Sequence, residues 1–153
     1  GLAADFRRAA QKHERRFIET GQLRLFPEIR ELLCYLASSD LRVFLASNCS
    51  VEYRDRVFAE LELHRYFDEA VCIGLFPGKR KADMVEAALA KHPECCSAVL
   101  VGDRASDIRA GRENGLFTVA CCYGFGKPAE LEDAALAVAL PKDLVQLFTE
   151  LLQ

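Results

Sequence analysis

The stretch VLVGDRASDIRAG, residues 99–111, places two carboxylates directly behind a short apolar run. Asp103 follows Gly102, which lets the backbone turn sharply, and Asp107 comes four residues later. A carboxylate at the end of a buried strand is unfavourable unless it has a partner. Mg²⁺ commonly binds one or two carboxylates together with water and substrate phosphate. The spacing therefore predicts that Asp103 and Asp107 bind a hard cation.

Further polar residues follow two other apolar runs. Ser47 and Asn48 come after VFLA, and the cations at 79–81 come after VCIG and a short connection. Hydroxyl and ammonium groups donate to phosphoryl oxygens. The sequence therefore predicts a phosphate site made of Ser47, Asn48 and Lys81 beside the cation site. Lys79 is an alternative to Lys81 that spacing does not exclude.

Each of these residues also has a purely structural interpretation. Ser47 and Asn48 could cap the helix that follows them. A single lysine is more often a solvated surface residue, and Asp107 could be only an acidic side chain in a first helical turn. The functional interpretation is favoured because all of these residues fall at successive strand ends, where open parallel α/β sheets bind their ligands.

Apolar runs alternate with amphipathic segments along the whole chain. We expect strands at 41–48, 69–74, 98–102, 116–122 and 136–140, and helices at 2–19, 27–38, 51–62, 81–91, 105–114 and 142–152. This alternation predicts an α/β protein with a parallel sheet that helices cover on both faces.

A nucleotide-binding domain is one α/β alternative. Neither G-x-G-x-x-G nor G-x-x-x-x-G-K-[ST] follows a strand, and we expect GFGKP at 124–128 to be a plain turn. This alternative is therefore weak.

Composition narrows the class of protein. The chain has 153 residues, of which 51% are hydrophobic and 28% charged, with a net charge of −3. These values favour one folded domain without a nucleic-acid or membrane partner. The seven cysteines include the adjacent pairs Cys95–Cys96 and Cys121–Cys122 but no C-x-x-C. We therefore expect reduced core thiols in a cytoplasmic protein, and no zinc site.

The order FLASN, Lys81 and VGDRASD resembles the haloacid dehalogenase-like hydrolases, and within them the phosphoglycolate-phosphatase-like branch. The resemblance runs from about Phe26 to the C-terminus. It implies a Rossmann-like core at 21–153, with a parallel sheet flanked by helices, and a remnant of a helical cap at 1–20. It also implies Mg²⁺-dependent hydrolysis of a small phosphorylated metabolite through an aspartyl-phosphate intermediate.

The resemblance implies a role for each matching residue. Ser47 would hydrogen-bond the phosphoryl group, with Asn48 supporting its loop. Lys81 would neutralise the nucleophile and the phosphate, so that Ser47 and Lys81 are the expected catalytic residues. Asp103 would bind Mg²⁺, and Asp107 would bind it directly or through water.

The chain departs from the family at the nucleophile. The family's nucleophile belongs to an Asp-x-Asp motif at the end of the first strand, and no such motif follows an apolar run here. The resemblance therefore implies that the first strand, the nucleophile and most of the cap are missing from this chain. We favour a chain that is part of a longer protein; a truncated gene product and a degenerate relative stay open. A catalytically inactive fragment, or a phosphate- or partner-binding module, is therefore the alternative function.

Overall fold

The computed structural model describes residues 8–9, 12–16, 19–21, 23–95 and 97–152. The strands are β1 (Phe44–Ser47), β2 (Glu69–Cys72), β3 (Val99–Gly102), β4 (Phe117–Cys121) and β5 (Leu136–Val138). The helices are α2 (Ile29–Ala37), α3 (Val51–Glu60), α4 (Lys81–Lys91), α5 (Ala105–Glu113), α6 (Pro128–Leu131) and α7 (Pro141–Leu151), with 3₁₀ turns η1 (Leu63–Arg65) and η2 (Ile73–Leu75). The expected order of strands and longer helices is confirmed from residue 27 onwards.

The expected N-terminal helix at 2–19 lies partly outside the described residues. Those that are described at 8–9, 12–16 and 19 are helical, and Gly21 has a positive φ of 60° after them. Residues 2–7, 10–11 and 17–18 of the expected helix are outside the described residues.

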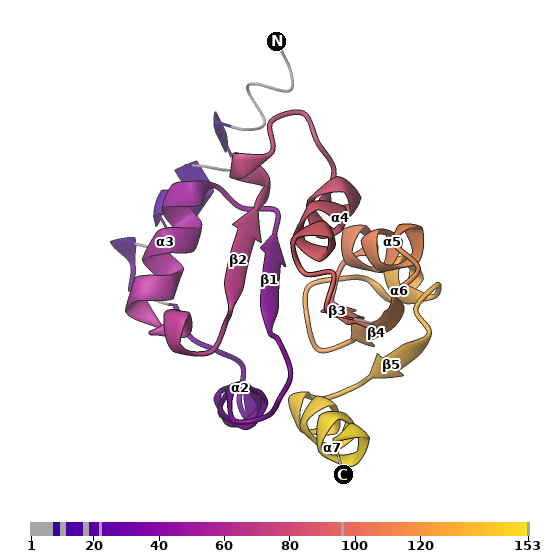
Figure 1. Cartoon of the computed structure of the whole chain (residues 1–153). Helices are drawn as coiled ribbons and strands as arrows, with labels where there is room; N and C mark the ends of the chain where they lie inside the picture. Colours follow the sequence, from indigo (N-terminus) through magenta and orange to yellow (C-terminus); the bar gives the residue numbers. More distant parts are fainter. Residues whose placement is uncertain (1–7, 10–11, 17–18, 22, 96, 153) are drawn as a thin grey trace.

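The strands are parallel, as predicted, but they form two sheets instead of one. One sheet has the order β1-β2 and the other β3-β4-β5, and no ladder joins β1 to β3 within the described residues. Figure 1 shows β1 and β3 as the inner strands of the two sheets, each with one edge toward the other sheet. The carboxyl ends of β1 and β3, which carry the candidate residues, therefore belong to different sheets.

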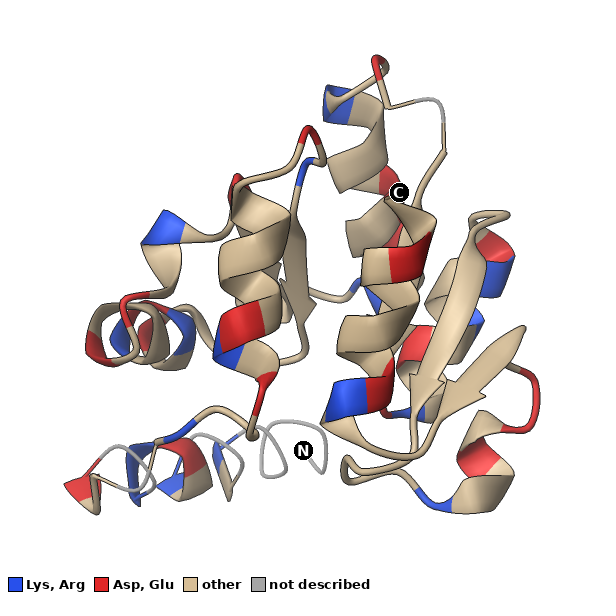
Figure 2. Cartoon of the chain, turned by 90° about the horizontal axis from the view of Figure 1, so that it is seen from below, with Lys and Arg blue, Asp and Glu red and all other residues tan. Residues whose placement is uncertain are grey.

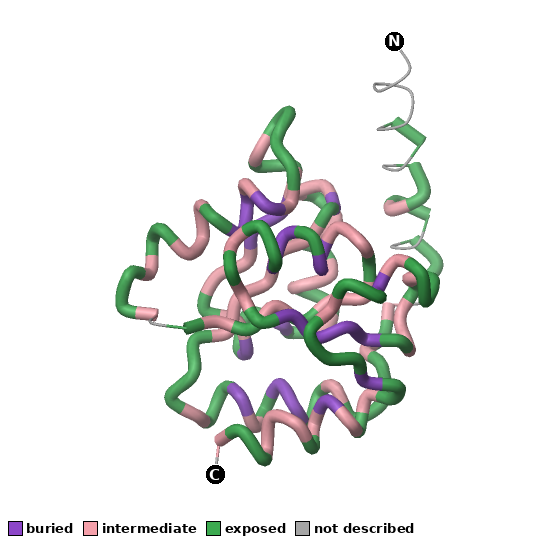
Figure 3. The backbone as a smooth tube through the Cα atoms, turned by 90° about the vertical axis from the view of Figure 1, so that its right-hand side faces the viewer, coloured by how far each residue is buried: buried purple, intermediate pink, exposed green. Residues whose placement is uncertain are grey.

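Helices cover both faces of the three-stranded sheet. On one face Leu36 of α2 and Leu144 of α7 pack with Val119 of β4; on the other, Ile108 of α5 packs with Ala120. Figure 3 shows this burial concentrated in the interior, with exposed residues along the outer helix surfaces. Burial of both sheet faces explains why the strands read as continuous apolar runs.

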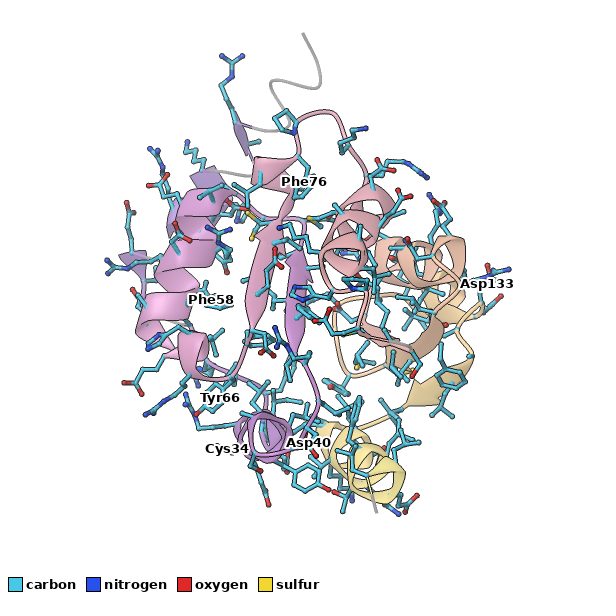
Figure 4. The ribbon with its side chains drawn as sticks, in the orientation of Figure 1. Cys34, Asp40, Phe58, Tyr66, Phe76 and Asp133 are labelled. Atoms are coloured by element: carbon cyan, nitrogen blue, oxygen red, sulfur yellow. The ribbon has the colours of Figure 1, made fainter. Side chains whose placement is uncertain are left out.

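Helix α4 connects the two sheets. Its Ala82 and Val85 pack with Ala110 of α5, and the same cluster includes Ala46 of β1 and Leu100 of β3. A further cluster, Leu33, Leu63 and Tyr66 with Phe58 beside them, lies between α2, α3 and η1 (Figure 4). Packing across α4, and not a strand ladder, therefore sets the positions of β1 and β3.

Some helix boundaries differ from the prediction. Helix α2 begins at Ile29 and not at Pro27, because Glu28 before it has a left-handed φ of 63°. The segment GFGKP is a turn as expected, but it leads into the unexpected α6, which has Pro128 at its first position. The end of α5 was predicted correctly, with Asn114 as C-cap and Gly115 at φ 68°.

The described cysteines are all free thiols, and only some belong to the core. Cys49, Cys72 and Cys121 are buried, as predicted, whereas Cys34 and Cys122 are exposed. Cys96 lies outside the described residues. Within the part of the chain that is described, no helix combines the length and the apolar character needed to cross a membrane.

Candidate active site

The turn after β3 is organised by Asp107. Its Oδ2 accepts hydrogen bonds from the backbone N–H groups of Asp103 at 3.1 Å and Arg104 at 2.9 Å. The residue is only 5% exposed. Because two amide donors and the N-terminus of α5 surround this oxygen, the carboxylate fixes the path of the chain from β3 into α5.

Gly102 is required for a different reason from the one the sequence suggested. Its φ is not among the positive values of the described glycines, so no left-handed turn demands glycine here. A Cβ at this position would instead overlap the side chain of Asp107. The glycine therefore permits close approach of the carboxylate to the end of β3.

Lys81 is the lysine that reaches this turn. Its Nζ lies 2.5 Å from Asp107 Oδ1, and the two side chains are only 12% and 7% exposed. Lys79 is exposed, and Arg80 forms ion pairs with Asp83 and Glu113 on the surface. The structure thus joins Lys81 to Asp107 and leaves the alternative, Lys79, without a hydrogen bond or ion pair to this turn among the described residues.

Asp103 has one engaged and one open carboxylate oxygen. Its Oδ2 accepts a hydrogen bond from the N–H of Phe125 at 2.6 Å, and Oδ1 has no hydrogen-bond donor among the described residues. Both oxygens of Asp107, by contrast, are engaged by Lys81 and by backbone amides. Asp103 is therefore the better placed of the two for direct metal binding.

The donor set fits Mg²⁺ only as a partial site. Within the described residues, no three His, Cys, Asp or Glu side chains lie close enough together to hold a metal ion. A single open carboxylate oxygen at Asp103 suits a hard cation that takes its other ligands from substrate phosphate, water and further oxygen donors. The arrangement agrees with that coordination and not with a closed structural metal site.

The loop after β1 faces the same turn. Ser47 ends β1, and Asn48 donates from Nδ2 to Ser106 Oγ in α5 at 3.3 Å. The N-cap of α3 is Ser50, whose hydroxyl accepts the N–H of Tyr53 at 3.2 Å. The capping interpretation of Ser47 and Asn48 is therefore wrong. Asn48 instead bonds to α5 next to the Asp103–Asp107 turn, and the Ser47 side chain hydrogen-bonds the Cys49 thiol.

The N-terminal helix contacts this loop through Glu14. Its carboxylate accepts the N–H of Ser50 at 3.3 Å and the Ser50 hydroxyl at 2.5 Å. An ion pair also joins Arg15 of this helix to Glu52 in the first turn of α3. Figure 2 shows basic and acidic residues interspersed over the described helices, without a region of a single sign. The helix therefore docks beside Ser50 through specific polar contacts.

Sequence reasoning missed the contributions of Phe125, Ser106 and Glu130. Glu130 accepts from Arg104 Nε at 3.0 Å and from the N–H of Ala105 at 3.4 Å. The Arg104 hydrogen bond, followed by those from backbone amides, lowers the pKa of Glu130. The glycines that flank Phe125 were the available signal, because Gly-x-Gly after a strand marks a close approach of the backbone.

Comparison with known proteins identifies the family. The model of the haloacid dehalogenase-like hydrolases matches residues 1–115. The chain belongs to this hydrolase family. A phosphoglycolate phosphatase of Pseudomonas savastanoi is 28% identical over 143 residues, which are 90% of this chain and 50% of the relative. The phosphoglycolate phosphatase of Aquifex aeolicus is 31% identical over 128 residues, 80% of this chain and 58% of the relative.

The structural comparison agrees with the family. A haloacid dehalogenase-like hydrolase from Streptococcus pneumoniae superposes with a TM-score of 0.72 at 28% identity, covering 82% of this chain and 60% of that protein. The expected Rossmann-like architecture of helices on parallel strands is thereby confirmed. This member of the hydrolase family spans about half the length of the curated relatives it matches.

Proposed function

We propose that this chain is the major part of the core of a Mg²⁺-dependent phosphatase that acts on a small phosphorylated metabolite. The observation that carries the proposal is the meeting of Lys81, Asp103 and Asp107 with the Ser47–Asn48 loop at the strand ends. Phosphoglycolate phosphatase relatives support a phosphate monoester as substrate. In this proposal residues 21–153 form the core, and residues 1–20 are the end of a helical cap.

We infer that the nucleophile is an aspartate that precedes Gly1 in a longer protein. Its Asp-x-Asp motif would end a strand that lies between β1 and β3. What supports this inference is that both of these inner strands leave one edge unpaired among the described residues. An unpaired edge in the middle of a parallel arrangement leaves backbone groups ready to bond to a further strand.

The residues of this chain would then act on the phosphoryl group. Ser47 donates its hydroxyl proton to a phosphoryl oxygen, Asn48 supports that loop, and Lys81 neutralises charge on the phosphate and the nucleophile. Asp107 positions Lys81, and Asp103 contributes its open oxygen to Mg²⁺. Bound there, Mg²⁺ supplies electrostatic stabilisation of the developing negative charge.

The reaction proceeds in two displacements at phosphorus. The upstream carboxylate attacks phosphorus, the bond to the leaving-group oxygen breaks, and this oxygen receives a proton from the second aspartate of the motif. That aspartate then removes a proton from water, which attacks the aspartyl-phosphate. The products are the free alcohol and inorganic phosphate, and the carboxylate is restored.

The test uses a protein extended upstream through its natural sequence, assayed on an aryl phosphate and on small phosphorylated metabolites with and without Mg²⁺. We expect Mg²⁺-dependent hydrolysis that Asp103→Asn abolishes, whereas Glu132→Gln, an exposed charge change, leaves it intact. Unchanged turnover in Asp103→Asn would contradict the role of Asp103. Phosphate-dependent stabilisation without any hydrolysis would instead support the non-catalytic binding module.

A further inference from the structure

The loop between β4 and α6, residues 122–127, closes around Asp103. The N–H of Phe125 donates to Asp103 Oδ2 at 2.6 Å. A Cβ at Gly124 would overlap the Asp103 side chain, and a Cβ at Gly126 would overlap the Asp103 carbonyl oxygen. The backbone of residues 124–126 therefore lies directly against Asp103.

The loop uses its backbone for this contact and not the Phe125 ring, since that residue is 82% exposed. The ring lies near Phe26, with centroids 6.4 Å apart. Because a side chain at Gly124 would push the Asp103 carboxylate away, the absence of Cβ there matters for the direction of the carboxylate.

The loop is itself anchored to the rest of the site. Gly124 donates its N–H to the carbonyl of Cys121 at 3.1 Å, and Cys122 donates to Val138 at 2.9 Å. At its far end, Glu130 accepts from the N–H of Lys127 at 3.4 Å and also from Arg104 Nε. The loop and the turn after β3 are thus tied together at both ends and form one unit.

We propose that the loop 122–127 is a positioning element for Asp103. By engaging Oδ2 through the Phe125 N–H, it keeps Oδ1 open and directed for a divalent cation. This inference rests on the proposed function, because it takes Asp103 as a cation ligand. It goes further in assigning the direction of that ligand to backbone atoms of a loop whose sequence carries no carboxylate of its own.

The experiment follows Mn²⁺ binding to the chain by paramagnetic broadening of backbone amide signals, a readout independent of turnover. Gly124→Ala is compared with Gly111→Ala, whose new Cβ would overlap the methyl group of Thr118, away from Asp103. We expect Mn²⁺ to broaden signals around Asp103 in the unaltered chain. Gly124→Ala should weaken this binding about 10–100-fold, as loss of an outer partner of a metal ligand does. Gly111→Ala should retain the original affinity.

A second pair of variants covers the case in which Gly124→Ala does not fold. Glu130→Gln removes the charge that ties Arg104 to the loop, whereas Glu132→Gln makes the same change of charge at an exposed neighbour. We expect weaker Mn²⁺ binding in Glu130→Gln than in Glu132→Gln. Equal affinity within this pair would then overturn the inference.

The outcomes separate this inference from the proposed function. Equal Mn²⁺ affinity in folded Gly124→Ala and the unaltered chain would overturn the positioning role while the phosphatase proposal stands. Absence of selective broadening in the unaltered chain would overturn the inference at its premise, that this chain's Asp103 binds the cation. The phosphatase proposal is judged separately, by turnover of Asp103→Asn in the extended protein.

Discussion

The turn after β3 and the loop after β1 lie at equivalent strand ends but are held very differently. In the turn, Asp107 binds Lys81 and two backbone amides, and Phe125 holds Asp103. Every one of these contacts involves a carboxylate. Removal of charge from water is unfavourable without partners, so the chain surrounds its charged groups with donors.

The loop after β1 is held mainly at its far end, where Ser50 donates to Glu14 and caps α3. Asn48 is exposed, and among the described residues its side chain makes one hydrogen bond, to Ser106 at 3.3 Å. The cap of α3 is formed by Ser50, so neither Ser47 nor Asn48 is needed to begin that helix. An exposed neutral side chain costs little free energy when it lacks a firm partner, whereas a buried carboxylate or lysine needs partners within the folded chain.

The largest test of this contrast is Asp107→Asn. It leaves the ammonium of Lys81, 12% exposed, without its charged partner. Loss of one member of a buried ion pair costs about 3–5 kcal/mol, so we expect a fall of that size in the free energy of unfolding. Urea unfolding measures it, and adding Lys81→Met should recover part of the loss.

The control for that prediction is an ion pair at the surface. Asp133 pairs with Arg112, with side chains 74% and 56% exposed, and Figure 4 shows Asp133 on the outer side of the molecule. Asp133→Asn should change the free energy of unfolding by no more than about 1 kcal/mol. If Asp107→Asn lowered the free energy of unfolding by no more than Asp133→Asn does, the turn after β3 would be no better organised than the surface.

The next effect in size is that of Gly102→Ala. The added Cβ would overlap the Asp107 side chain, and overpacking of this kind costs about 1–3 kcal/mol. We expect a lower urea midpoint and a weaker Lys81–Asp107 contact, measured as faster solvent exchange of the Asp103 and Arg104 amides. An unchanged midpoint would mean that the turn relaxes without loss and is not closely fitted.

Local sequence patterns predicted much of the fold and the contents of the site. Helix α4 was predicted at 81–91 and lies at Lys81–Lys91, because its apolar residues repeat at helical spacing and its ends are polar. The Asp103–Asp107 spacing and the Ser47 position were also sufficient to locate the strand ends. The roles of these residues in catalysis stay predictions.

The same patterns could not predict contacts between segments that are distant in the sequence. Phe125 meets Asp103 across 22 residues of sequence, through the parallel register of β3 and β4. The need for glycine at position 102 likewise depends on where the Asp107 side chain lies. Which serine caps α3 depends on the residue at which that helix begins. The division into two sheets depends on which strands pair, and the periodicity of a single strand carries no information about its pairing partner.

The next smaller effect on stability tests whether Ser50 or Ser47 caps α3. Ser50→Ala removes the N-cap of α3 and the partner of Glu14, and should lower the free energy of unfolding by about 1 kcal/mol. Ser47→Ala should change it by less than about 0.5 kcal/mol while weakening binding of inorganic phosphate. Thermal unfolding with and without phosphate measures both, and the reverse order of stabilities would contradict the assignment.

The smallest effect lies at the amino ends of β1 and β2, away from the site. Glu69 Oε1 is 2.6 Å from Lys91 Nζ, and Oε2 is 3.2 Å from His92 Nε2, a ring that also faces Glu94 and Phe44. The hydrogen bond from Lys91, reinforced by the one from His92, holds the pKa of Glu69 below its ordinary value of 4.5.

A lowered folded-state pKa means that the stabilisation is present above about pH 4.5 and is lost as the pH falls through the folded value. Glu69→Gln should therefore be less stable than the unaltered chain near neutrality, by about 0.2–1 kcal/mol for a pair at the surface, and the difference should vanish in acid. Urea unfolding over a pH series measures this, with Glu86→Gln, an exposed change on α4, as the control. A difference that persists in acid would show that Glu69 acts through packing and not through charge.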